Sequence, residues 1–68
     1  MKNKISGLRV ALGYTQQEMA EIFGVSKQAY WNKENGKTPF TDKEKKLFIN
    51  KAKTVFPEVT IESIFFGN

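Results

Sequence analysis

The sequence predicts an all-α fold, a compact bundle of five short helices, and three observations lead to this prediction. Apolar residues recur at helical spacing along the chain, and no stretch shows the alternation typical of a strand. Two capping boxes, Thr15 with Glu18 and Thr41 with Glu44, mark the starts of helices. Glycine or proline separates the segments, so the connections between them are short. We expect the 68 residues to form a single domain, residues 1–68.

The first two helices are predicted from apolar spacing and from end signals. The first, over residues 4–12, has its apolar residues on one face: Ile5, Leu8 and Leu12. Gly13 is placed to end it. The second helix begins after Thr15, and Gly24 ends it in the left-handed conformation that glycine adopts at little cost.

Three further helices follow the same signals. The third is expected from the Ser26 cap to about Asn35, with Gly36 after it. The fourth is expected after Thr41 and before Pro57, with one apolar side formed by Leu47, Phe48, Ala52, Val55 and Phe56. A last short helix is expected after Thr60, with apolar residues Ile61, Ile64 and Phe65.

The composition narrows the classes of function. The chain has no Cys and no His, so the usual catalytic and metal-binding constellations are missing, and we expect no enzyme and no cofactor. The net charge of +4 favours a polyanionic partner, although a lysine-rich surface also serves solubility. No apolar run approaches the roughly 20 residues that span a bilayer. The basic start lacks a secretory apolar segment, so a cytoplasmic location without membrane contact is expected.

The outward side of the third helix has side chains suited to base edges. Four of them face roughly the same way at helical spacing: Lys27, Gln28, Trp31 and Asn32. Gln and Asn can form paired hydrogen bonds with adenine, and Lys can donate to guanine. A polar stripe is usually only a solvated face. The combination with a glycine turn between two capped helices favours a DNA-binding helix-turn-helix, with Ala29 and Tyr30 turned inward.

At this point the chain resembles a known family. The residues that carry the resemblance are the run Thr15 to Ala20, the turn Gly24-Val25-Ser26 and the ending Glu34-Asn35-Gly36-Lys37. They are similar to the Cro/phage-repressor (XRE-type) helix-turn-helix family, over about residues 5–66. The resemblance implies a lambda repressor-like DNA-binding domain whose third helix enters the major groove of a double-stranded operator.

The resemblance also implies roles for particular residues. Base contacts fall to Lys27, Gln28 and Asn32, and phosphate contacts fall to Gln16, Asn35 and Lys37. Gln16 is also expected to brace the recognition helix. Position adds Gln17, at the start of the second helix, and Thr38, beyond the third, to the expected phosphate contacts. Arg9 and Glu34 match a family pair that forms a structural salt bridge, worth at most about 1 kcal/mol if it is exposed.

Two positions depart from the family pattern. Trp31 stands where a small polar residue is usual. It either contacts sugars and base methyls or is covered by a neighbouring loop or a partner subunit. Lys33 stands where many relatives have an apolar core residue. Its stem is expected to pack while its amine reaches water or a phosphate.

Two surface features remain open. The basic residues of the fourth helix form either a solvated face or a source of long-range attraction to DNA: Lys43, Lys45, Lys46, Lys51 and Lys53. The C-terminal apolar residues partly fill the core, and the rest can form a dimer patch: Ile61, Ile64, Phe65 and Phe66. A weak homodimer on a two-fold operator is expected.

These observations predict a sequence-specific transcriptional regulator, a small phage or mobile-element repressor of the Cro type. Because the chain ends at Asn68, a minimal switch protein without a further domain is expected. The alternative is an antirepressor or antitoxin-like module that binds another repressor protein. Trp31 and the Phe-rich tail would then form its interface.

Overall fold

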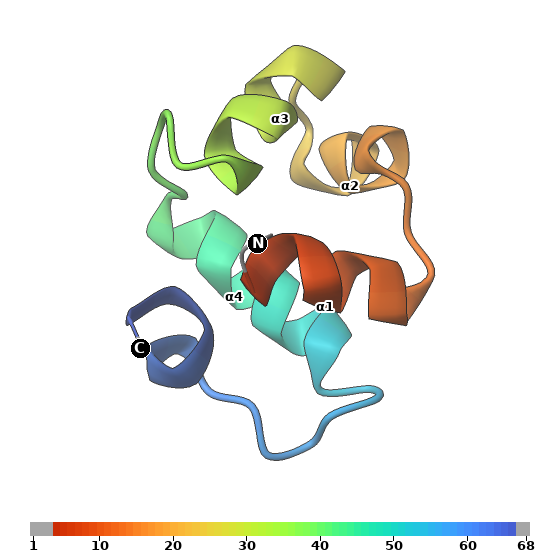
Figure 1. The fold of residues 1–68 in the computed structure, drawn as a ribbon, viewed down its shortest axis with the longest axis vertical. Helices are drawn as coiled ribbons and strands as arrows, with labels where there is room; N and C mark the ends of the chain where they lie inside the picture. Colours follow the sequence, from red (N-terminus) through yellow and green to blue (C-terminus); the bar gives the residue numbers. More distant parts are fainter. Residues whose placement is uncertain (1–3, 67–68) are drawn as a thin grey trace.

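The computed structural model describes residues 4–66, in which helices alternate with connecting loops (Figure 1). The elements are α1 (Lys4–Leu12), α2 (Gln16–Phe23), α3 (Lys27–Glu34), α4 (Asp42–Ala52) and a π-helical turn, η1 (Glu62–Phe66). Residues 4–66 contain no strand. The prediction of an all-α bundle of five short helices is confirmed.

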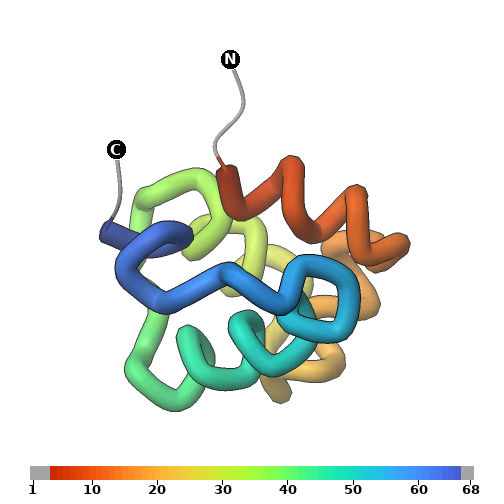
Figure 2. Tube along the Cα trace, turned by 90° about the horizontal axis from the view of Figure 1, so that it is seen from below, coloured from red at the N-terminus to blue at the C-terminus, as the bar shows by residue number. Residues whose placement is uncertain are grey.

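The helices form two groups. In Figure 1, α2 and α3 lie together at the top, and α1 crosses α4 below them. The C-terminal turn η1 lies beside the start of α1, as Figure 2 shows from below. There the amine of Lys4 donates a hydrogen bond to the carbonyl of Ser63, with a length of 2.6 Å. The two ends of the described chain therefore lie side by side.

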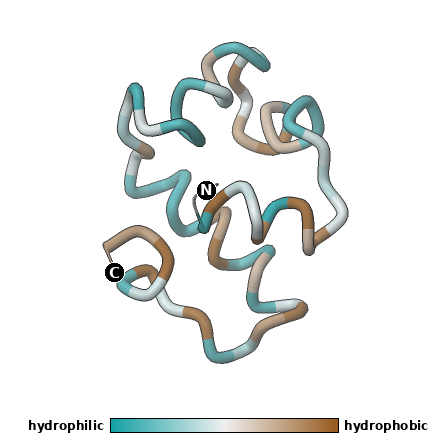
Figure 3. The backbone as a smooth tube through the Cα atoms, in the orientation of Figure 1, coloured by the Kyte–Doolittle hydropathy of each residue, from teal (hydrophilic) through white to brown (hydrophobic). Residues whose placement is uncertain are grey.

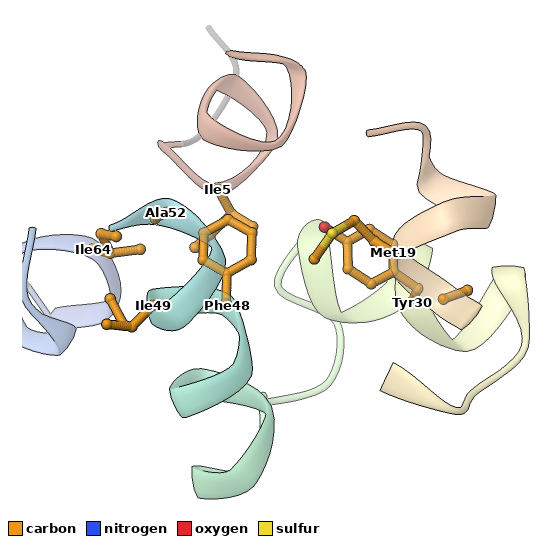
Figure 4. Close-up of a cluster of buried hydrophobic side chains, with 8 residues drawn as sticks. Ile5, Met19, Tyr30, Phe48, Ile49, Ala52 and Ile64 are labelled. Atoms are coloured by element: carbon orange, nitrogen blue, oxygen red, sulfur yellow. The ribbon is translucent and has the colours of Figure 1, made fainter. Parts of the chain in front are cut away.

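The core receives at least one buried apolar side chain from every element (Figure 4). The residues are Ile5, Met19, Ala20, Tyr30, Phe48, Ile49, Ala52 and Ile64. Tyr30, Phe48 and Met19 are the largest of those that are fully buried. Tyr30 is the residue through which α3 packs into this core.

Aromatic rings extend the core from α2 to the C-terminal turn. Phe40, in the loop between α3 and α4, meets Phe23, Tyr30 and Phe65 edge to face, with centroids 5.2–6.4 Å apart. Phe65 also packs edge to face on Phe48. Such pairs contribute about 0.5–1.5 kcal/mol each beyond burial. The rings hold the α3–α4 loop against the core.

The fourth helix is shorter than its apolar pattern suggests. It ends at Ala52, so the prediction that Val55 and Phe56 belong to its apolar side is wrong. Both residues lie beyond the helix, and Val55 is 52% exposed. The hydroxyl of Thr54 donates to the Lys51 carbonyl at 2.7 Å, a local bond that competes with helix continuation. Pro57 further disfavours helical backbone at the residue before it.

The last helix is present as the wider turn η1. Thr60 and Ser63 exchange hydrogen bonds between side chain and backbone, each 3.0 Å long, in the manner of a capping box. Ile64 is buried and Phe65 is half-buried, whereas Phe66 is 64% exposed. Part of the C-terminal apolar surface thus fills the core, and Phe66 remains outside it.

Candidate nucleic-acid interface

The α2–α3 pair is fixed by its caps and by the turn between the two helices. Thr15 and Glu18 form a reciprocal capping box at the start of α2. Gly24 ends the helix in the left-handed region, with φ of 72°, where an L side chain would be strained. The backbone N–H of Val25 then donates to the Ala20 carbonyl at 3.0 Å. Ser26 caps α3 by accepting from the Ala29 N–H at 3.1 Å.

Beneath α3, a buried carboxylate joins three helices. The carboxylate of Glu34 accepts a hydrogen bond from Arg9 Nε of α1 at 2.7 Å. It also accepts from Gln16 Nε2 of α2 and from the Tyr30 hydroxyl, each at 2.8 Å. The Glu34 side chain is 3% exposed and that of Arg9 is 13% exposed. These four residues, here called the inner network, fix the orientation of α3 relative to α1 and α2.

The inner network changes the ionisation of its members. Burial acts to raise the pKa of Glu34, but hydrogen bonds from Arg9, Gln16 and Tyr30 outweigh it, so the pKa lies below its usual value. The hydrogen bond to Glu34 raises the pKa of Arg9. Burial, followed by the bond to Glu34, raises the pKa of Tyr30. The network therefore contains one carboxylate and one guanidinium at neutral pH, with Tyr30 protonated as a donor.

The sequence predicted the pairing of Arg9 with Glu34, and the structure contains this ion pair in a largely buried form. The upper limit of about 1 kcal/mol for an exposed pair therefore does not apply. The participation of Tyr30 was missed, although its position one helical turn before Glu34 was a usable signal. Gln16 was expected to brace the recognition helix, and it does so through its bond to Glu34, although that partner was not specified.

The outer face of α3 presents polar groups that the protein leaves largely to solvent. Lys27, Gln28 and Trp31 are exposed, and they line a hollow of about 430 Å³. The Gln28 Nε2 donates to Asn32 Oδ1 at 3.1 Å. The Gln28 carbonyl oxygen and the Asn32 amide nitrogen take no part in this bond. Figure 3 shows that α3 and the loop after it are mostly hydrophilic, in contrast to the brown C-terminal turn.

The residues expected to contact phosphate lie on both sides of that face. Gln16 and Gln17 share a second hollow of about 490 Å³ with Lys27, between the end of α1 and the starts of α2 and α3. Gln17 also donates to Glu21 at 3.2 Å. On the other side, the exposed residues Lys37 and Thr38 follow α3. The hollows at Gln16 and at Trp31 share Lys27 as a lining residue, so they adjoin.

Asn35 and Trp31 connect α3 to the loop that follows it. The Asn35 side chain donates to the Trp31 carbonyl at 2.9 Å. Trp31 is 37% exposed, and the amine of Lys37 lies 5.8 Å from its ring centroid. One side of the indole is thus covered by a loop residue, and the ring also borders the outer hollow. This position of Trp31 is compatible with both predictions, contact with sugars and base methyls or coverage by a neighbouring loop or a partner subunit.

The prediction for the Lys33 amine is wrong. The amine was predicted to reach water or a phosphate, but it forms a salt bridge with Glu44 at 3.0 Å and donates to the Pro39 carbonyl. The Lys33 side chain is 14% exposed. Burial acts to raise the pKa of Glu44, but the Thr41 backbone bond and the Lys33 amine outweigh it and lower that pKa. Lys33 therefore joins α3 to α4 in place of an apolar contact.

A family model described as helix-turn-helix matches residues 5–44, more than half of the chain. The chain belongs to the helix-turn-helix family of the Cro/phage-repressor (XRE) type. Its matched range contains the inner network, the outer face of α3 and the loop after it. A domain of this family makes the protein a DNA-binding transcriptional regulator, of a class that is typically not enzymatic. No curated protein and no solved structure shows a significant match to the chain.

Residues 4–66 were also compared with the requirements of a membrane-spanning helix and of a metal site. Within that range, no helix has the length and apolar character needed to cross a membrane. The same residues contain no group of three or more carboxylate side chains placed to hold a metal ion.

Proposed function

We propose that this helix-turn-helix protein is a sequence-specific repressor that inserts α3 into the major groove of an operator. The observation that carries the proposal is the contrast between an exposed polar edge of α3 and the buried inner network behind it. A recognition helix needs side chains free to meet base edges and a scaffold that fixes their position. The buried pairing of Glu34 with Arg9 supplies that scaffold.

Lys27, Gln28, Trp31 and Asn32 are the proposed base-contacting residues. Gln28 and Asn32 are joined by one hydrogen bond, which aligns their amides along the helix. Gln28 retains a second N–H and its carbonyl oxygen, the donor and acceptor that adenine requires in the major groove. Lys27 is suited to guanine, and the Trp31 ring to thymine methyls and sugars.

Phosphate contacts are proposed on two flanks of α3. Gln16 and Gln17 lie at the start of α2, where free backbone N–H groups also favour an anion. Gln16 has one N–H bonded to Glu34, and its second N–H remains for a phosphate. Asn35, Lys37 and Thr38 form the other flank, beyond the end of α3. Contacts on both sides fix the helix in the groove and add no sequence preference.

We also propose that the protein is a small phage or mobile-element regulator of the Cro type. Bound to a promoter, it blocks or redirects polymerase. A weak homodimer would place two copies of α3 on half-sites about one DNA turn, roughly 34 Å, apart.

Selection from a random duplex library by the purified protein, at physiological salt, tests this proposal. Enrichment of one motif supports a sequence-specific regulator, and a palindromic motif supports the dimer. The selection is repeated with Gln28→Ala, and with Asn50→Ala as a control at an exposed amide of α4. The first variant should lose preference at one base position, and the control should reproduce the original motif. Absence of any enriched motif would reject the base-reading proposal and favour the antirepressor or antitoxin-like alternative.

A further inference from the structure

A groove of about 640 Å³ runs between the α3–α4 loop and the C-terminal turn. Its apolar lining comes from the start of α1, the loop and η1: Ile5, Pro39, Phe40, Ile64, Phe65 and Phe66. Phe66 is 64% exposed, although it is one of the largest apolar side chains of the protein. A duplex presents phosphates to this side of α3, and phosphates do not need an apolar lining. The groove therefore has a chemistry that the proposed DNA contacts do not use.

The same groove has an excess of positive charge. Its charged lining residues are Lys33, Lys37, Lys45 and Glu34, and the Glu34 carboxylate is paired with Arg9. Lys33 is neutralised by Glu44 at 3.0 Å. Among residues 4–66, neither Lys37 nor Lys45 lies within salt-bridge distance of a carboxylate.

These two amines lie against aromatic rings instead. Lys45 Nζ is 4.4 Å from the Phe66 ring centroid, and Lys37 Nζ is 5.8 Å from that of Trp31. A cation over a ring keeps its charge available on the solvent side. The groove thus combines apolar rings with two cations that have no acidic partner in the described part of the chain.

We propose that this groove binds an acidic segment of another protein, anchored by a large apolar side chain. The anchor would pack against Phe65 and Phe66, and flanking carboxylates would meet Lys37 and Lys45. Aromatic rings in a partly enclosed groove are typical sites of strong anchoring. Charge complementarity around them selects the partner and speeds association.

The positive charge of the groove also disfavours occupants that come from this protein, either a second copy or the ends of the chain. A second copy has a net charge of +4 and an identical lysine-lined groove, so two grooves facing each other repel. Residues 1–3 and 67–68 contain no acidic side chain, and residue 2 is a lysine. An acidic segment from a different protein fits the charge of the groove, whereas these occupants do not.

Binding in the groove has a consequence for DNA. Asn35, Lys37 and Thr38 line the groove and are also the proposed phosphate contacts on that flank of α3. A segment that occupies Lys37 therefore competes with the duplex. This consequence rests on the proposed function, whereas the binding of the segment does not.

The test is a selection of peptides from a random library displayed on phage, against the full chain at physiological salt and without DNA. Recovered peptides are then synthesised with a fluorescent label and measured by anisotropy. The expected consensus has Asp and Glu on both sides of Phe, Leu or Trp. Failure to recover any peptide, or recovery of peptides without this acidic bias, overturns the proposal.

Matched variants identify the groove as the binding site. Lys45→Glu should weaken peptide binding by about tenfold or more, because it places a carboxylate against the acidic segment. Lys46→Glu makes the same charge change at an exposed neighbour that does not line the groove, and should change the affinity by about twofold or less. Phe66→Ser should also weaken binding, and its ring is exposed enough to be removed without unfolding the core. Equal effects of Lys45→Glu and Lys46→Glu overturn the assignment.

Competition with DNA is measured last, with the duplex selected above. The peptide should displace the duplex from the original protein and from Lys46→Glu. Displacement should require higher peptide concentrations with Lys45→Glu. Peptide binding without displacement would retain the groove and reject its overlap with the DNA contacts. Failure of DNA selection together with normal peptide binding would reject the proposed function alone.

Discussion

The two faces of α3 treat polar side chains in opposite ways. On the inner face, Tyr30 and Glu34 are buried and bonded to each other, and Glu34 is also bonded to Arg9. On the outer face, Lys27 and Trp31 are exposed. The inner groups bond to one another across three helices, so they favour this arrangement of α1, α2 and α3. The outer groups have few constraints within the protein, so their arrangement can be set by a ligand. A helix of eight residues thereby separates structure from recognition.

The largest predicted effect comes from breaking the inner face. Glu34→Ala leaves the Arg9 guanidinium largely buried, with its bond to the Tyr14 carbonyl but without a carboxylate. Removal of one partner from a buried ion pair costs about 3–5 kcal/mol, and we expect a loss near the lower end because Arg9 retains some exposure. The free energy of unfolding, measured by urea titration, checks this prediction.

The matched control for this substitution is Glu21→Ala. Glu21 is an exposed carboxylate of α2 whose recorded hydrogen bond comes from Gln17. Its removal should change the free energy of unfolding by about 0.5 kcal/mol or less. Similar losses for the two variants would show that the inner network is not a special source of stability.

The next effect should appear in binding and not in stability. Gln28→Ala removes an exposed amide of the outer face, so the free energy of unfolding should stay within about 0.5 kcal/mol. Affinity for the selected operator should fall by about 1–3 kcal/mol, and one base position should become degenerate. Binding measurements on the operator and on single-position variants separate the two outcomes. An equal loss on every sequence would remove Gln28 from the base contacts.

Acid should act on the inner face more weakly than the removal of Glu34, because a protonated carboxyl still fills its site. The pKa of Glu34 is lower in the folded protein than its usual value. Its contribution to stability is thus complete above the unfolded-state pKa, about 4.3, and is lost as the pH falls through the lower folded-state value. Glu44 changes stability in the same direction.

Urea titrations between neutral pH and the acid range test this dependence. Glu34→Gln removes the titrating group and should make the decline on acidification shallower than in the original protein. Glu44 is unchanged in this variant, so part of the decline should remain. The same slope in both proteins would assign the acid sensitivity to other carboxylates.

The sequence was sufficient for features that depend on local signals. The capping box at Thr15, the glycine turn at Gly24 and the cap at Ser26 each follow from a few neighbouring residues, and each is present. Leu12 was predicted as the last residue of the first helix from the apolar spacing and from Gly13, and α1 ends there. Residues at the starts and ends of the helices were therefore sufficient to predict these boundaries.

Features that depend on contacts between distant residues were not predictable. The salt bridge from Lys33 to Glu44 requires a particular crossing of α3 over α4, which no local pattern specifies. The early end of α4 depends on a hydroxyl bond from Thr54, against an apolar spacing that favours continuation to Val55. The DNA contacts of the outer face stay a prediction, because they depend on a ligand and not on the packing of this chain.

The smallest predicted effect concerns Lys37, which lies where the outer face meets the loop. If its amine meets a phosphate, Lys37→Ala should weaken binding to all duplexes alike and reduce the slope of log affinity against log salt by about one unit. Lys46→Ala, at an exposed position of α4, is the control and should leave the slope close to that of the original protein. Titrations at several salt concentrations, on operator and unrelated duplexes, give both slopes.

An unchanged slope for Lys37→Ala would show that Lys37 does not contact a phosphate and would favour a structural role. Its amine lies 5.8 Å from the Trp31 ring centroid, a contact that can orient the indole without any phosphate. In that case the substitution should alter the fluorescence of Trp31, the only Trp of the chain, in the absence of DNA. A changed slope with unchanged fluorescence would instead place Lys37 with the residues whose arrangement is set by the duplex.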